Sequence, residues 1–165
     1  MAESVQNAIR AQAGKYLTFK LGAEEFGIEI LKVQEIIGMM KVTAVPRAPG
    51  FVRGVINLRG KVIPVVDLRL KFGMQSLPDT EHTCIIVVQV KHQGGQLTMG
   101  TLVDDVSEVL DVETEQIEPP PDFGTALSTD FILGMGKVGQ KVVMLLDVDR
   151  VLAGGQADAV ADLAA

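Results

Sequence analysis

Gly54-Val-Ile-Asn-Leu-Arg-Gly-Lys-Val-Ile-Pro-Val-Val-Asp-Leu68 recurs 80 positions further along the chain as Gly134-Met-Gly-Lys-Val-Gly-Gln-Lys-Val-Val-Met-Leu-Leu-Asp-Val148. Four positions are identical in the two copies, and six others are apolar in both. A second echo, at a spacing of 73, relates residues 27–36 to residues 100–109. Because the two echoes keep their order, they predict an internal duplication. The seam between two such halves is a natural place for a ligand.

Composition indicates a chain that can bury a sizeable core. Its 165 residues suit one domain or two closely joined halves, and 47% of them are apolar. Aromatic residues make up only 4% and Trp is absent, so Val, Ile, Leu and Met must fill the core. The net charge of −6 argues against nucleic-acid binding.

Charge is divided unevenly along the chain. Residues 1–80 hold 11 basic and 7 acidic side chains, whereas residues 81–165 hold 4 and 14. The halves therefore carry net charges of +4 and −10. Either the two surfaces are simply solvated, or the ends of the molecule prefer different partners, in which case some partner contacts should be sensitive to salt.

Cysteine use and hydropathy predict a soluble cytoplasmic protein without direct membrane insertion. The lone Cys84 lies in an apolar run and can form no internal disulfide, as expected in a reducing compartment. The N-terminus lacks the apolar stretch of a signal peptide, and no apolar run reaches membrane-spanning length.

The pattern of alternation and turns predicts a mainly β fold. Hairpins are expected around Arg59-Gly60 and within the second copy, and Asp67 and Asp147 are candidate N-caps of short helices. Many short strands in two copies predict two small β-barrels that share a hydrophobic core. We expect a polar leader at 1–14, a domain at 15–155 whose halves meet near 74–82, and a tail at 156–165.

A search for catalytic chemistry finds no site in the sequence. The two histidines, His82 and His92, have no cysteine or carboxylate cluster around them in sequence, so neither a metal nor another cofactor is expected. Residues 134–139 match G-x-G-x-x-G by letter but fall within a predicted hairpin, where the phosphate-binding geometry does not apply. We therefore expect no enzyme and no catalytic residue, although a site assembled from distant residues would escape this search.

Residues 16–152 resemble the bacterial chemotaxis coupling-protein family, CheW. The hairpin tip Asn57-Leu-Arg-Gly60 is the most specific part of the resemblance, and five other segments support it in the same order: 16–22, 26–36, 62–68, 103–110 and 117–121. The resemblance implies two SH3-like five-stranded β-barrels around a shared core. It also implies a scaffold that couples the cytoplasmic tips of transmembrane chemoreceptors to the regulatory domain of the histidine kinase CheA. Such a scaffold is recruited to membrane-associated receptor arrays, with further copies of itself in rings.

Two surfaces are carried over from this resemblance by position. A receptor-binding groove between the barrels is expected to include Ile30, Val33, Glu35, Arg59, Val106 and Val109. A kinase-binding surface is expected around Val42, Phe51, Gly54 and Leu70. Residue types alone leave Arg59 either a carboxylate-binding side chain or a solvated turn residue.

Three alternatives remain at the level of sequence. The chain could be the regulatory module of a related chemosensory pathway that does not control chemotaxis. It could be a piece of the homologous kinase domain, although its polar leader and tail favour a standalone adaptor. An enzyme of unrecognised type is the third, and it lacks a site.

Overall fold

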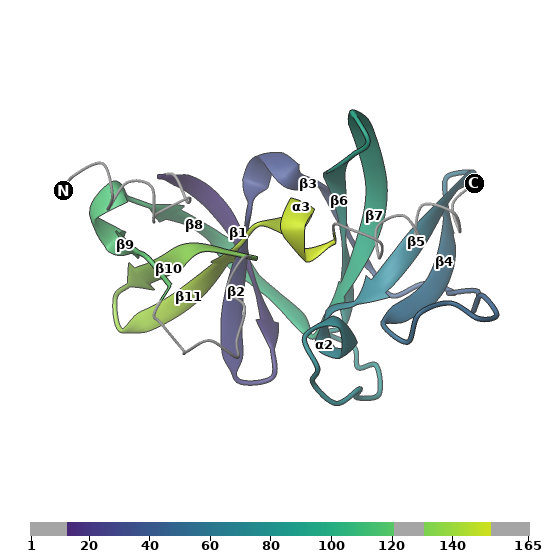
Figure 1. Ribbon diagram of the computed structural model, residues 1–165. Coiled ribbons are helices and arrows are strands. Elements are labelled where there is room, and N and C mark those ends of the chain that lie inside the picture. The colour runs from purple at the N-terminus through teal and green to yellow at the C-terminus, as the bar shows by residue number, and fades with distance from the viewer. Residues whose placement is uncertain (1–12, 121–130, 153–165) are drawn as a thin grey trace.

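Two β-sheets lie side by side in the computed structural model, which describes residues 13–120 and 131–152 (Figure 1). Most of the expected leader and all of the tail lie outside the described residues. Strands dominate the rest, so the prediction of a mainly β fold is confirmed. Within the described residues, no helix has the length and apolar character needed to cross a membrane.

One sheet has six strands. They span Gly14–Leu21 (β1), Glu24–Glu29 (β2), Asp105–Val112 (β8), Ile117–Glu118 (β9), Ile132–Val138 (β10) and Lys141–Leu146 (β11). Their order is β8-β1-β2-β11-β10-β9, and β11 pairs with β2 in parallel. The two-residue β9 is one strand more than the expected five, and it adds to β10 through only two paired positions.

The other sheet has five strands. They span Val33–Gly38 (β3), Val52–Leu58 (β4), Lys61–Asp67 (β5), Cys84–His92 (β6) and Gly95–Val103 (β7). Their order is β3-β6-β7-β5-β4, and β5 pairs with β7 in parallel. Four short helices lie between or after the strands: the 3-10 helices Ile30–Lys32 (η1) and Thr114–Gln116 (η2), and the α-helices Leu68–Lys71 (α2) and Val148–Val151 (α3).

The two sheets have the same strand order when each strand is replaced by its equivalent in the other copy of the repeat. Strands β3, β4 and β5 of the first half combine with β6 and β7 of the second, while β8, β10 and β11 combine with β1 and β2. The halves have therefore exchanged strands. The expected boundary near 74–82 does not separate the sheets, because it lies between β5 and β6 of one sheet.

Details of pairing repeat as well. Both hairpins of the longer echo carry a register shift at the same place, before Gly54 in one copy and before Gly134 in the other. Asp67 and Asp147 each cap the following helix, accepting from the backbone N–H of Leu70 at 3.3 Å and of Arg150 at 3.2 Å. The predictions of duplication and of both N-caps are confirmed.

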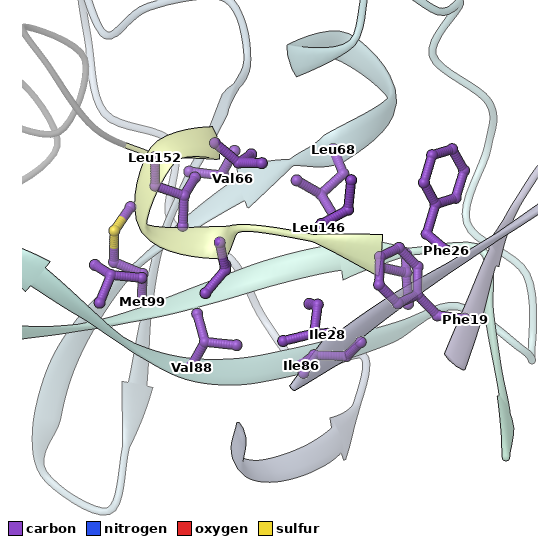
Figure 2. Packing of buried hydrophobic residues seen from close by; sticks show 14 of the residues in the cluster. Phe19, Phe26, Ile28, Val66, Leu68, Ile86, Val88, Met99, Leu146 and Leu152 are labelled. Carbon is purple, nitrogen blue, oxygen red and sulfur yellow. The ribbon is translucent and has the colours of Figure 1, made fainter. Parts of the chain in front are cut away.

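The strand exchange creates three apolar clusters. One shared core lies between the sheets and joins both of them to α2 and α3 (Figure 2). Each sheet also has a smaller cluster on its other face. Strand β6 serves two of the clusters, because Ile86 and Val88 point into the shared core while Ile85 and Val87 point away from it. This explains why residues 84–88 form a continuous apolar run, and it confirms the prediction of a shared core. The SH3-like form of each sheet stays a prediction.

Candidate functional site

Four of the six residues expected in a receptor-binding groove lie on edge strands, two on each sheet. Val33 and Glu35 are on edge strand β3, with Ile30 just before them in η1. Val106 and Val109 are on edge strand β8 of the other sheet. The two edge strands are equivalent in the repeat. Each follows a strand of the other sheet, β2 before β3 and β7 before β8, so the duplication itself places both sets at edges.

Arg59 and Glu35 form an ion pair across the five-stranded sheet. The guanidinium Nη2 of Arg59 donates to Oε1 of Glu35, linking the tip of the β4–β5 hairpin to edge strand β3. Arg59 and Gly60 both have positive φ, of 54° and 87°, which is the geometry of a tight two-residue hairpin. The structure thus brings together two of the predicted residues, and gives Arg59 a carboxylate partner within the chain.

The four apolar residues of the predicted groove differ in exposure. Val109 is 48% exposed, whereas Ile30, Val33 and Val106 are partly buried and pack against the shared core. Val109 is therefore the member of this set best placed to meet a partner, and Val33 has a structural role as well. Substitution of Val33 would disturb both packing and any binding surface.

Leu31 is the most exposed large apolar side chain of the described residues, at 91%, and the sequence analysis missed it. It is the middle residue of η1, and together with Ile30 it lines a hollow of about 120 Å³. Because η1 breaks the alternation of the strand, a period-two pattern gives no indication that Leu31 points outward. Ile36, on β3, is also exposed and was also missed.

Asp149 fixes η1 in place from the C-terminal helix. Its Oδ2 lies 2.8 Å from Nζ of Lys32 in η1, and its Oδ1 accepts from the backbone N–H of Lys91 in β6 at 2.9 Å. Both side chains of the ion pair are about three-quarters buried. One carboxylate of α3 therefore holds together the helix that presents Leu31 and the strand next to β3.

Residues of the expected kinase-binding surface take part in two separate contacts within the chain. At Gly54, an added Cβ would lie 2.1 Å from the backbone oxygen of Thr43 and 2.9 Å from Cγ1 of Val42, so only glycine fits there. The Thr43 and Val55 backbones form a bridge at this point, with hydrogen bonds of 2.8 and 2.9 Å. Phe51 lies under the ammonium of Lys71, 4.4 Å from its ring centre, and Leu70 beside it is 37% exposed.

A third ion pair joins α2 to the crossing between the sheets. Arg69 donates from Nε to Oδ1 of Asp104 at 2.6 Å and from Nη2 to Oδ2, and the backbone N–H of Gly22 donates to the same carboxylate at 2.7 Å. The hydrogen bonds from Arg69 lower the pKa of Asp104, against the opposing effect of burial. Asp104 lies at the bend between β7 and β8, so this contact ties the five-stranded sheet to the β1–β2 turn of the other.

Reactive groups are sparse in the described part of the chain. No three His, Cys, Asp or Glu side chains within residues 13–120 and 131–152 gather in a way that could hold a metal ion. Burial raises the pKa of the Cys84 thiol, which disfavours the nucleophilic thiolate. The arrangement offers edges, exposed apolar side chains and ion pairs, which are the features of a surface that binds other molecules.

Comparison with known proteins agrees with this geometry. Residues 15–156 match the model of the CheW-like domain family. A Klebsiella aerogenes protein described as "Chemotaxis protein CheW" is 44% identical over 138 residues, which cover 84% of this chain and 81% of that protein. A Rhizobium etli protein described as "Probable chemotaxis protein CheW" is 34% identical, covering 87% and 90%. The crystal structure of the scaffolding protein TtCheW from Thermoanaerobacter tengcongensis matches with a TM-score of 0.76 and 32% identity, covering 88% of this chain and 96% of that one.

Proposed function

The chain belongs to the CheW-like family, and from this premise we propose that it is a non-catalytic scaffold that couples chemoreceptors to the histidine kinase CheA in chemotaxis. Its relatives are described as chemotaxis proteins, and a solved structure of the same fold is described as a scaffolding protein. The protein acts in the cytoplasm, beneath membrane-associated receptor arrays, and further copies of it complete the rings.

The observation that carries this proposal is the presence of exposed apolar side chains on separate elements of a CheW-like fold. Val109 lies on edge strand β8 and Leu31 on η1, whereas Leu70 lies on α2. A scaffold must hold two partners at once, so it needs two surfaces that do not compete. We assign the receptor to the surface of Ile30, Val33, Glu35, Arg59, Val106 and Val109, and the kinase to the surface of Val42, Phe51, Gly54 and Leu70.

The receptor surface suits an apolar helix lying along an edge. Val109 and Leu31 supply apolar contact, and the Arg59–Glu35 pair supplies charge at one side. A helix that docks in this way presents apolar residues at positions i, i+3 or i+4, and i+7. The cytoplasmic tips of chemoreceptors are the partner that this family resemblance implies.

The test measures binding of the purified chain to a cytoplasmic receptor fragment and to the kinase regulatory domain, each alone. We expect Val109→Asp to weaken receptor binding at least tenfold, because a charge would be buried against an apolar partner. Val142→Asp is the matched control, since Val142 lies on β11 outside both surfaces and is 53% exposed. Equal receptor affinity of the two variants would refute the assignment of the groove.

A further inference from the structure

An open pocket of about 480 Å³ lies where the two halves of the repeat meet. The end of α2, the face of the six-stranded sheet and α3 all line it, and Lys71 and Val151 are equivalent positions of the repeat that both contribute. Pockets of 300–1,000 Å³ between packed elements commonly hold small organic ligands. None of the residues assigned to the receptor or the kinase surface lines this pocket.

The wall of the pocket is apolar and rich in aromatic rings. Phe26, Phe72 and Phe131 line it and stack in sequence, with ring centres 5.8 and 5.5 Å apart. Met74 and Met144 complete the apolar wall. Thioether side chains adapt to the shape of a bound group and make favourable contacts with aromatic rings. The wall therefore suits a flat or branched apolar body.

Two cations, one from each helix segment, line the same pocket. Lys71 is the last residue of α2, and Arg150 lies in α3. The Nε of Arg150 lies 3.6 Å from Oδ2 of Asp147. Lys71 has no carboxylate partner among the described residues, and its ammonium lies over the ring of Phe51. Burial lowers the pKa of Lys71, as expected for an ammonium that has lost water without gaining a counter-ion. No described acidic residue lines the pocket to balance the two charges.

We propose that this seam pocket binds a small organic carboxylate with an aromatic or branched apolar body. The apolar part would pack on Phe72, Phe131 and the two methionines, and the carboxylate would meet Lys71 and Arg150. The assignment rests on charge complementarity: a purely apolar ligand would leave the Lys71 ammonium without a partner, whereas a carboxylate neutralises it. This proposal does not rest on the scaffold function proposed above, although Lys71 also lies over Phe51 of the kinase surface.

The probe is 4-phenylbutyrate, with 4-phenylbutan-1-ol as the neutral ligand of the same shape. The full chain is labelled with 13C at its methionine methyl groups and titrated with each compound. The signals of Met74 and Met144 should shift with saturation, while that of Met99, which is fully buried in the shared core, should not. We expect the acid to bind at least tenfold more tightly than the alcohol, because its charged hydrogen bonds are absent from the alcohol complex.

Two variants test whether the positive charges of the pocket, rather than its shape, determine the affinity for the acid. Lys71→Gln and Arg150→Gln should each weaken binding of the acid several-fold and leave binding of the alcohol unchanged. Lys15→Gln is the control, because Lys15 is an exposed lysine on β1 that pairs with Asp111 and does not line the pocket. A thermal melt of each variant verifies folding, and two independent substitutions keep the test valid if one of them fails to fold.

Several outcomes would overturn the proposal. The first is that the acid and the alcohol bind with equal affinity. The second is that both glutamine variants bind the acid as tightly as the wild type. The third is that the signals of Met74 and Met144 do not shift at millimolar ligand. A fourth is a shift of these two signals on addition of a kinase or receptor fragment but not of the acid. That result would make the pocket a protein-docking surface.

Discussion

Gly27 and Gly100 occupy equivalent positions at the two parallel strand pairs of the molecule. Gly27 on β2 lies opposite Leu145 on β11, and Gly100 on β7 lies opposite Val65 on β5. The glycines are 73 residues apart and their partners 80, which are the spacings of the two sequence echoes. The two halves of the repeat join through these parallel strand pairs. At each glycine, large side chains of neighbouring strands pack over the glycine backbone.

Gly100→Ala should destabilise the protein by about 1–3 kcal/mol, because a Cβ there would lie 2.8 Å from Cγ2 of Ile85 and 3.3 Å from Cγ2 of Val65. The matched control is Gly38→Ala, since a Cβ at Gly38 meets no atom within 4 Å. Urea unfolding of both variants gives the comparison. Equal stability of the two would mean that Gly100 is not required by packing.

Asp104→Asn should lower the stability by roughly 1–2 kcal/mol at neutral pH, because it removes the charge from hydrogen bonds with Arg69 and Gly22. The pKa of Asp104 is lowered in the folded state, so its contribution is fully present above the ordinary pKa of 3.8 and is lost as the pH falls through the folded value. The difference between wild type and variant should therefore shrink under acid conditions.

Denaturant unfolding between pH 2 and pH 7 checks this dependence. Asp105→Asn serves as the control, since Asp105 is the adjacent carboxylate on β8 and makes no ion pair among the described residues. A constant difference between Asp104→Asn and wild type across the whole range would contradict the role given to the Arg69 contact.

Arg59→Glu should weaken binding to one protein partner by roughly 1–3 kcal/mol, through lost hydrogen bonds and repulsion. Its effect on stability should stay within about 1 kcal/mol, because the ion pair with Glu35 is largely exposed on the arginine side. The double variant Arg59→Glu with Glu35→Arg should recover the stability but not the binding. Affinity at low and high salt, beside a melting curve, tests this.

Recovery of normal binding by the double variant would mean that Arg59 acts only by holding Glu35. Normal binding of Arg59→Glu to both partners at low salt would leave Arg59 a turn residue without a binding role. Each of these outcomes contradicts the expected one in a different way.

The sequence predicted the parts of the fold that depend on repetition and local chemistry. The echoes of Gly54 and Asp67 correctly predicted two like hairpins and two capped helices, because turns and N-caps depend on a few neighbouring residues. The exchange of strands between the halves could not be predicted in this way, because it depends on which strands of one half pair with strands of the other. Pairing partners far apart in sequence leave no local pattern.

The same limit applies to the candidate site. Glu35 and Arg59 were expected in one groove, and the structure brings them into contact. The role of Asp104 was missed, because its partner Arg69 lies 35 positions away, in helix α2. Leu31 was missed because it lies in a single turn of 3-10 helix, where the alternation of strand residues is interrupted.

Leu70→Asp and Val109→Asp should have opposite effects on the two partners. Leu70→Asp should weaken binding of the kinase regulatory domain at least tenfold and leave receptor binding unchanged, because Leu70 lies on α2 and is exposed. Val109→Asp should do the reverse. Isothermal titration of each variant with each partner fragment gives four affinities. Loss of both affinities in one variant with an unchanged melting curve would place the two partners on one surface.

In the proposed function, one chain holds a receptor and a kinase at the same time. Analytical ultracentrifugation of the purified chain with a labelled receptor fragment and a labelled kinase regulatory domain tests it most directly. We expect a single sedimenting species that carries both labels, and we expect either Leu70→Asp or Val109→Asp to abolish it. Two separate binary complexes, with the receptor fragment displacing the kinase domain, would contradict it.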